Sequence, residues 1–198
     1  MLKLFCMSIL VKKRSLGQYF TVDNFWLKKH ILDFILSTKT NIAIDPFAGN
    51  GDLLKVMRGT GYKKLIGFDI DSSLNWEKKD SLIDIPKIKN SIIVTNPPYL
   101  TNYSAKRKGI YDEVEKYFKD SKYEDLYQVA LEKCLKNDFG VLIIPETFLN
   151  SSFPKNRLTN ITIIEDNLFN DTEVPICVVC FDNKIKTLDK IKVSFRTR

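Results

Sequence analysis

Short apolar runs that alternate with helix-forming segments are the feature that most restricts the fold of this chain. Three of these runs end directly at a polar side chain: Asn41–Ile44 at Asp45, Leu65–Phe68 at Asp69, and Ser91–Thr95 at Asn96. Continuous apolar strands separated by helices are typical of a mostly parallel sheet that is covered on both faces. Ligands of such sheets bind at the carboxyl ends of the strands. The sequence therefore predicts an α/β domain whose binding site lies beside these polar side chains.

The other segments extend the same alternation. Apolar residues at helical spacing predict three helices: Asn24–Leu36, with Asp23 or Asn24 as its N-cap, Asp52–Met57, and Tyr123–Leu135. Three further strands are expected: Gly140–Ile144, Asn160–Glu165 and Ile176–Phe181. The connection between the last two is too short for a crossover helix, so they should be antiparallel. The polar, basic segment Thr101–Asp112 is expected to be a mobile loop.

Length and charge bound the class of protein. A chain of 198 residues is long enough for one α/β domain and short for two, so we expect a single catalytic domain over residues 1–198. The net charge of +7 favours a polyanionic partner. Clusters of Lys and Arg are, however, as often simple solvated surface as they are binding sites. No apolar stretch is long enough to span a bilayer, which predicts a cytoplasmic protein without membrane contact.

A metal centre is not expected from this sequence. Cys177 and Cys180 have the spacing of half a zinc site, but they lie in a predicted strand, where positions i and i+3 face opposite sides. They are interpreted as core thiols. His30 is the only histidine, so neither a histidine-based triad nor a histidine-rich metal site can form.

A glycine-bearing loop follows the first strand: Asp45-Pro46-Phe47-Ala48-Gly49-Asn50-Gly51. Gly49 and Gly51 permit positive φ and close approach of a ligand to the backbone, although a tight turn without a ligand fits this pattern equally well. Asp69 ends the next strand, where an acid in a nucleotide-binding fold accepts the ribose hydroxyls, and Asp71 is its competitor. Loop and acid together predict an adenosine site.

The tetrapeptide Asn96-Pro97-Pro98-Tyr99 is the most specific motif. The exocyclic amine of adenine is a poor nucleophile, because its lone pair is delocalised into the ring. Catalysis therefore needs acceptors for both N–H bonds: the side-chain oxygen of Asn96 and the backbone carbonyl of Pro97. The two prolines fix φ and contribute no competing N–H. Tyr99 offers an aromatic face for a base extruded from the duplex.

With these motifs in this order, the chain resembles the amino-methylating DNA methyltransferases of the N6-adenine class. The resemblance extends from about Leu16 to Phe181. It implies a Rossmann-like class I fold dependent on S-adenosylmethionine, with a mostly parallel seven-stranded sheet and a terminal antiparallel hairpin. It also implies methylation of adenine N6 in double-stranded DNA by base flipping, within a restriction-modification system.

The same resemblance assigns roles to individual residues. Gln18, Tyr19, Phe20 and Thr21 would pack over the methionine end of the cofactor, and Asp45 would hold its amino group. Gly49 and Gly51 would admit the cofactor, Asp69 would bind its ribose, and Asp80 would face its adenine amine. Phe169 would offer a second ring to the flipped base, opposite Tyr99, unless it is a core phenylalanine.

One departure from the family concerns recognition of DNA sequence, because no target-recognition domain is visible. Three explanations remain open. The sequence is the catalytic part of a longer protein, a separate subunit recognises the DNA, or the loop after Tyr99 and the basic tail are enough to recognise a short site. In each case Lys106, Arg107 and Lys108 would contact phosphates. The alternatives are a protein glutamine or RNA adenine methyltransferase, and a non-catalytic partner subunit.

Overall fold

A computed structural model describes residues 24–119, 121–164, 174–185 and 192–194. Gln18 to Thr21 and Phe169 lie outside these residues. The helices are α2 (Lys29–Ser37), α3 (Asp52–Gly59), α4 (Asn102–Arg107), α5 (Tyr111–Phe118) and α6 (Leu126–Cys134), with one 3-10 turn, η1 (Glu146–Asn150). The strands are β1 (Ile42–Asp45), β2 (Lys64–Asp69), β3 (Glu77–Lys78), β4 (Ser91–Thr95), β5 (Phe139–Pro145), β6 (Leu158–Ile164), β7 (Ile176–Asp182) and β8 (Lys192–Ser194).

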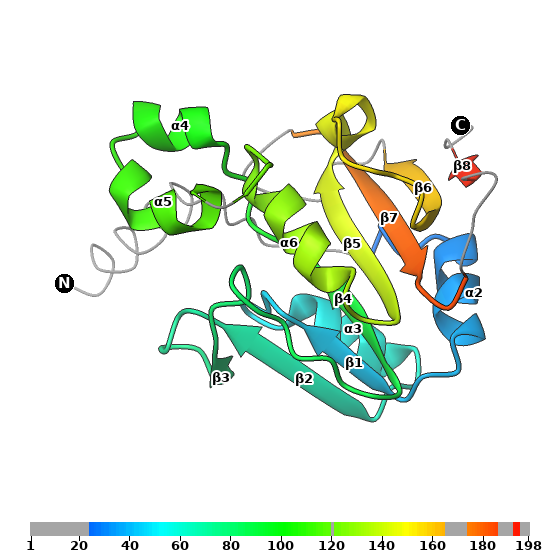
Figure 1. Cartoon of the computed structure of the whole chain (residues 1–198). Helices are drawn as coiled ribbons and strands as arrows, with labels where there is room; N and C mark the ends of the chain where they lie inside the picture. Colours follow the sequence, from blue (N-terminus) through cyan, green and yellow to red (C-terminus); the bar gives the residue numbers. More distant parts are fainter. Residues whose placement is uncertain (1–23, 120, 165–173, 186–191, 195–198) are drawn as a thin grey trace.

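All these strands join one sheet in the order β3-β2-β1-β4-β5-β7-β6-β8 (Figure 1). Strand β7 lies between β5 and β6 and is antiparallel to both, whereas the other pairs are parallel. The predicted mostly parallel sheet with a terminal antiparallel hairpin is confirmed. The predicted count of seven strands is wrong, because the described residues form eight. The two-residue β3 and the three-residue β8 are too short to leave an apolar pattern.

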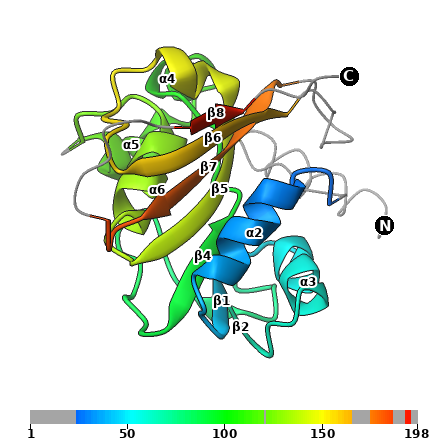
Figure 2. The ribbon, with the colours of Figure 1, turned by 90° about the vertical axis from the view of Figure 1, so that its right-hand side faces the viewer.

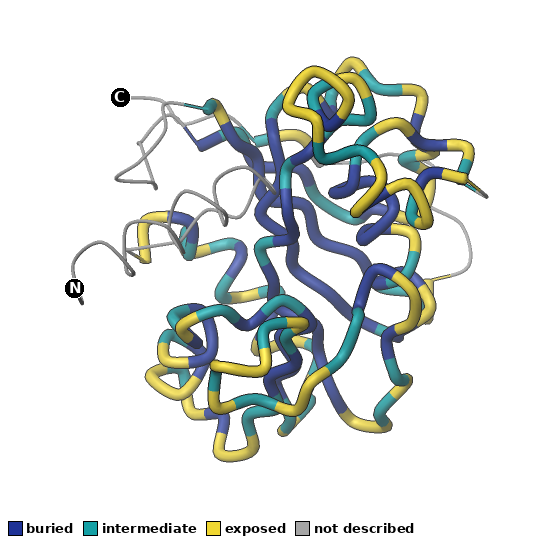
Figure 3. The backbone as a smooth tube through the Cα atoms, turned by 90° about the vertical axis from the view of Figure 1, so that its left-hand side faces the viewer, coloured by how far each residue is buried: buried dark blue, intermediate teal, exposed yellow. Residues whose placement is uncertain are grey.

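Helices cover both faces of the sheet, with α2 and α3 on one side and α4, α5 and α6 on the other (Figure 2). The central strands are buried over most of their length (Figure 3). Cys177 packs in the cluster with α6, and Cys180 packs in the cluster with α2 and α3. Burial raises the pKa of each of these thiols to about 12, so both remain protonated core residues, as expected.

The boundaries of two helices differ from the prediction. Helix α2 begins at Lys29 rather than near Asn24, because Asn24 to Trp26 form a turn and Lys28 is extended. Helix α6 begins at Leu126 rather than Tyr123, because the preceding Asp125 bridges to Thr101. An apolar residue outside each helix is buried in the core, Trp26 before α2 and Tyr123 before α6, and so extends the apolar pattern beyond the helix.

The prediction of a mobile loop over Thr101–Asp112 is wrong, since this segment forms α4 and the start of α5. The Thr101 hydroxyl accepts a hydrogen bond from the Ser104 amide (2.9 Å) and so caps α4. Ala105 is fully buried on the inner side of α4. The polar, basic side chains belong to the outer side, which explains the loop-like composition.

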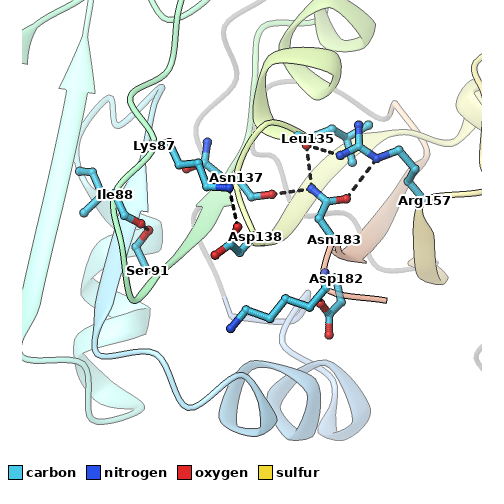
Figure 4. A network of polar contacts seen from close by, with 10 residues as sticks. Lys87, Ile88, Ser91, Leu135, Asn137, Asp138, Arg157, Asp182 and Asn183 are labelled. Atoms are coloured by element: carbon cyan, nitrogen blue, oxygen red, sulfur yellow. Dashed lines mark hydrogen bonds and ion pairs between the residues drawn. The ribbon is translucent and has the colours of Figure 1, made fainter. Parts of the chain in front are cut away.

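Helix α6 is fastened at its carboxyl end by a polar network (Figure 4). The side-chain nitrogen of Asn183 (Nδ2) donates to the Leu135 carbonyl (2.7 Å) and to the Asn137 carbonyl. Arg157 donates to the Leu135 carbonyl and, through Nε, to the Asn183 side-chain oxygen (3.1 Å). Carbonyls at a helix end lack partners within the helix, so these side chains stabilise α6 where it ends. Within the described ranges, no helix is long and apolar enough to cross a membrane.

Candidate active site

A pocket of about 220 Å³ lies along the carboxyl edge of the sheet, between the ends of β4 and β3. Residues that follow the parallel strands form its floor: Asp45, Phe47, Ala48, Gly49, Asn50, Asp52, Leu53, Asp69, Ile70, Lys79, Asp80, Ser81, Leu82, Asn96 and Pro98. Helices α5 and α6 supply the opposite wall: Glu113, Val114, Tyr117 and Leu126. The described lining has five carboxylates and one lysine. In a chain of net charge +7, this pocket is suited to a cationic ligand.

Asp45 is the most buried acid of the pocket, with 1% of its surface exposed. Its Oδ1 accepts hydrogen bonds from the Phe47 amide (3.0 Å) and the Thr95 hydroxyl (2.6 Å). Burial nevertheless raises the pKa of Asp45 to about 7. A buried carboxylate with so high a pKa is short of positive charge, and a ligand ammonium would supply it. Thr95 directly precedes Asn96, so its hydrogen bond connects Asp45 to the backbone next to the predicted catalytic residue.

Gly49, in the loop after β1, contacts Asp69 at the end of β2. The Gly49 amide donates to Asp69 Oδ2 (2.9 Å), and the Asp71 amide donates to Asp69 Oδ1 (2.9 Å). Gly49 has φ of 51°, in the left-handed region. The two amides hold the Asp69 carboxylate at the pocket wall, and each of its oxygens keeps a second lone pair for a ligand hydroxyl. The Asp71 side chain instead caps its own turn through Ser73.

Gly51 has the positive φ that the sequence predicted and a second structural reason besides. Neither Gly51 nor Pro46 is in the described lining of the pocket. Gly51 has φ of 76°, and a Cβ atom at this position would lie 2.6 Å from Cζ2 of Trp76. The second glycine of the loop is therefore required by the indole of Trp76, a residue that no sequence motif had indicated.

Asp80 lines the pocket and holds the covering helix α5. Its Oδ2 accepts hydrogen bonds from Lys116 Nζ (2.7 Å) and the Tyr117 hydroxyl (2.9 Å). The hydrogen bond to Asp80 raises the pKa of Lys116. Sequence reasoning missed this wall of the pocket, because α5 was not predicted.

Ser81 follows Asp80 and is 2% exposed. Its hydroxyl is buried against the pocket and has no hydrogen-bond partner among the residues that the structure describes. A buried hydroxyl without a partner is costly, and a ligand with a polar atom at this place would satisfy it. Nothing in the sequence around Ser81 indicates such a role.

The tetrapeptide lies at the end of β4, where Asn96 and Pro98 line the pocket. Pro97 and Tyr99 are outside its described lining. The Tyr99 hydroxyl lies 2.6 Å from Asn96 Oδ1 and 2.9 Å from the Ile143 carbonyl, and it donates its one proton to these two acceptors. The Tyr99 ring lies edge-on to Tyr127, with centroids 6.4 Å apart. The Tyr99 hydroxyl therefore orients the Asn96 side-chain amide.

The basic residues predicted to contact phosphates lie on α4 and the residue that follows it. Lys106, Arg107 and Lys108 are exposed and outside the described pocket lining. Lys106 Nζ lies 4.8 Å from the ring centroid of Tyr111, and Arg107 Cζ lies 6.0 Å from that of Tyr103. The ring of Tyr103 is itself 73% exposed. Cations interleaved with an exposed ring suit a nucleic acid.

His30 contacts Thr162, with 2.8 Å between Nε2 and Oγ1, away from the pocket. Across the described parts of the chain, no three His, Cys, Asp or Glu side chains are grouped as metal ligands would be.

A match to a protein family assigns this chain to a family. Residues 24–173 match the Eco57I restriction-modification methylase family. The chain belongs to this family. The residues that this Eco57I-type match covers include all those that line the described pocket. No curated protein matches the chain significantly in sequence.

Several solved structures share this fold. A Listeria monocytogenes protein described as a class I S-adenosylmethionine-dependent methyltransferase has 12% identity and a TM-score of 0.58, covering 88% of this chain and 67% of its own. A type I restriction-modification methyltransferase subunit from Streptococcus thermophilus has 12% identity and a TM-score of 0.58, covering 83% and 44%. A Pyrococcus horikoshii protein described as an RNA methyltransferase has 15% identity and a TM-score of 0.53, covering 86% and 88%. This chain thus spans under half of the type I subunit. Its fold is that of class I methyltransferases.

Proposed function

We propose that this Eco57I-type methylase transfers the methyl group of S-adenosylmethionine to the N6 amine of adenine in double-stranded DNA. The observation that carries this proposal is the single pocket that unites Asn96 with the acids Asp45, Asp69 and Asp80. The acids match a cationic nucleoside ligand, and Asn96 matches a planar amine. Neither feature alone would define the reaction.

The residues present fit the cofactor from end to end. Asp45 would bind the ammonium of its methionine part, which supplies the charge that the buried carboxylate lacks. Asp69 would bind the ribose hydroxyls, and Asp80 with Ser81 would bind the adenine edge, where an amine lies next to a ring nitrogen. Bound there, the cofactor supplies an electrophilic methyl group on a sulfonium. Gln18, Tyr19, Phe20 and Thr21 are proposed to cover its methionine end.

The substrate amine is proposed to be held by Asn96 and Pro97. Asn96 Oδ1 has two lone pairs, so one can accept from Tyr99 while the other accepts from an amine N–H. The Pro97 carbonyl would accept the second N–H, which favours a pyramidal nitrogen with a free lone pair. A base inside a duplex cannot reach the pocket, so the adenine must be flipped out. Phe169 remains the proposed stacking partner, and Tyr99 acts mainly through Asn96.

Incubation with tritium-labelled S-adenosylmethionine and duplex DNA, RNA or a protein extract tests the proposed reaction. We expect label in duplex DNA, recovered after digestion as N6-methyladenine, and only background with Asn96→Ala. Label only in RNA or on protein glutamine would contradict the proposal. If DNA becomes labelled only after a sequence-reading subunit is added, recognition comes from a second chain.

Replacement of the exposed Lys106 and Arg107 by alanine is expected to weaken binding of a DNA duplex, whatever its base sequence. Each phosphate contact that is lost should reduce the slope of log K against log salt by about 0.9. Fluorescence anisotropy of a labelled duplex between about 50 and 200 mM salt measures this slope. Arg58→Ala is the matched control, because Arg58 is an exposed arginine in the last turn of α3. If Arg58→Ala reduces the salt slope as much as the changes at Lys106 and Arg107 do, the placement of DNA on α4 is contradicted.

Ser81→Ala is expected to raise the Kd of S-adenosylmethionine about five-fold, the effect of losing one hydrogen bond. The unliganded protein should be no less stable, since the buried hydroxyl has no partner among the described residues. Isothermal titration calorimetry measures the affinity and thermal unfolding the stability. Unchanged affinity would remove Ser81 from the site.

A further inference from the structure

Trp76 contacts the glycine loop, residues 45–51, from outside the described lining of the pocket. It lies in the connection between β2 and β3, and its side chain is half-buried. The indole Nε1 donates a hydrogen bond to the Gly49 carbonyl (2.8 Å). The Gly49 amide, on the other side of the residue, donates to Asp69. Gly49 is therefore fixed at both of its backbone polar groups.

The indole ring also occupies the space that two glycines leave free. A Cβ atom at Gly67, in β2, would overlap Cε3 of Trp76 and would lie 2.9 Å from the Ala48 Cβ. A Cβ atom at Gly51 would meet the opposite edge of the same ring. The indole is thus packed between β2 and the glycine loop. A side chain at Gly67 or Gly51 would collide with it.

We propose that Trp76 is a positioning residue for the cofactor, a role that rests on the proposed function. Trp76 holds the Gly49 carbonyl while Asp69 holds the Gly49 amide, so the peptide planes on both sides of Gly49 are fixed, and the packing of the indole sets how far the loop stands from β2. The pocket wall from Gly49 to Asp69 then has its ligand-binding geometry before the cofactor arrives. A preorganised site loses less entropy on binding, so Trp76 contributes to cofactor affinity without contact.

Two changes perturb this arrangement by different routes. Trp76→Phe removes the indole N–H and keeps an aromatic ring, while Gly67→Ala keeps the tryptophan but displaces its indole from β2. Each is expected to raise the Kd and KM for S-adenosylmethionine about five- to ten-fold, the cost of one hydrogen bond. The kcat at saturating cofactor should remain close to that of the wild type, which separates lost binding from lost chemistry.

The chain offers a matched control for each change. Trp26 is the only other tryptophan, is fully buried, and has no partner for its Nε1 among the described residues. Trp26→Phe therefore removes an indole N–H elsewhere in the core. Gly59, at the end of α3, has open space where a Cβ would be, so Gly59→Ala adds a methyl group that touches nothing. Neither control should change the cofactor Kd.

Calorimetric titration of all five proteins with S-adenosylmethionine, together with tryptophan fluorescence, tests the inference. Because the wall is formed before the cofactor binds, the Trp26→Phe protein, in which Trp76 is the fluorophore, should keep its emission maximum on cofactor binding, and a shifted maximum would contradict the preorganisation. A wild type that binds no S-adenosylmethionine overturns the proposed function and this inference together. A wild type that binds it, with Trp76→Phe and Gly67→Ala binding equally well, overturns the inference alone.

Discussion

Asp45→Asn is expected to stabilise the unliganded protein at about pH 8 while it weakens S-adenosylmethionine binding about a hundred-fold. Burial raises the pKa of Asp45 from 3.8 to about 7, so the folded protein takes up a proton that the unfolded chain does not bind between these values. Stability of the wild type should therefore fall as pH rises from about 4 to about 7. An amide of the same shape carries no buried charge, and its oxygen can still accept from Thr95 and the Phe47 amide.

The gain in unfolding free energy should be about 1 to 3 kcal/mol at about pH 8 and should shrink toward about pH 5, where the wild-type carboxyl is itself protonated. Thermal unfolding across this pH range measures the gain, and calorimetry measures the cofactor Kd. Asp52→Asn is the control, because Asp52 also lines the pocket but is half-exposed and paired with Lys55 (2.8 Å). A loss of stability in Asp45→Asn at high pH, or unchanged cofactor affinity, would contradict this view of Asp45.

Asn96→Ala is expected to lower kcat for methyl transfer about a hundred- to thousand-fold and to leave cofactor affinity nearly unchanged. The acceptor oxygen acts on the amine while the new bond forms, so its loss affects the rate more than binding. Tyr99→Phe should lower kcat about ten-fold, since it removes only the hydroxyl that orients the amide. Pre-steady-state methyl transfer to duplex DNA measures both.

The double variant separates the two residues. If Tyr99 acts through Asn96, adding Tyr99→Phe to Asn96→Ala should cause little further loss, whereas independent contributions would multiply. Multiplied losses would instead support direct stacking of the base on Tyr99. Cofactor affinity in all variants shows whether the pocket has remained intact.

The sequence was sufficient for the parts of the site that lie at strand ends. Asp45, Asp69 and Asn96 end apolar runs, and the sheet brings such ends to one edge, so their convergence in one pocket follows from the alternation alone. The antiparallel pair β6 and β7 was likewise predictable from its short connection. These features are local in the chain or follow from the topology.

Features that depend on tertiary packing were missed. Trp76 and Ser81 have no periodic context, and their roles come from neighbours that are distant in sequence or from a missing partner. Helices α4 and α5 were overlooked because their exposed sides are polar and their buried sides are narrow. The wall of the pocket opposite the sheet was therefore absent from the prediction.

Helices α4 and α5 have a further consequence, because Asp80 connects two binding events. The carboxylate proposed to bind the cofactor's adenine also holds Lys116 and Tyr117 of α5. The adjoining α4 carries Lys106 and Arg107, the proposed phosphate contacts. Thermodynamic reciprocity then requires that, if the cofactor strengthens duplex binding by some factor, the duplex strengthens cofactor binding by the same factor. Because Asp80 is common to the cofactor site and to α5, we expect the two proposed affinities to be coupled through it.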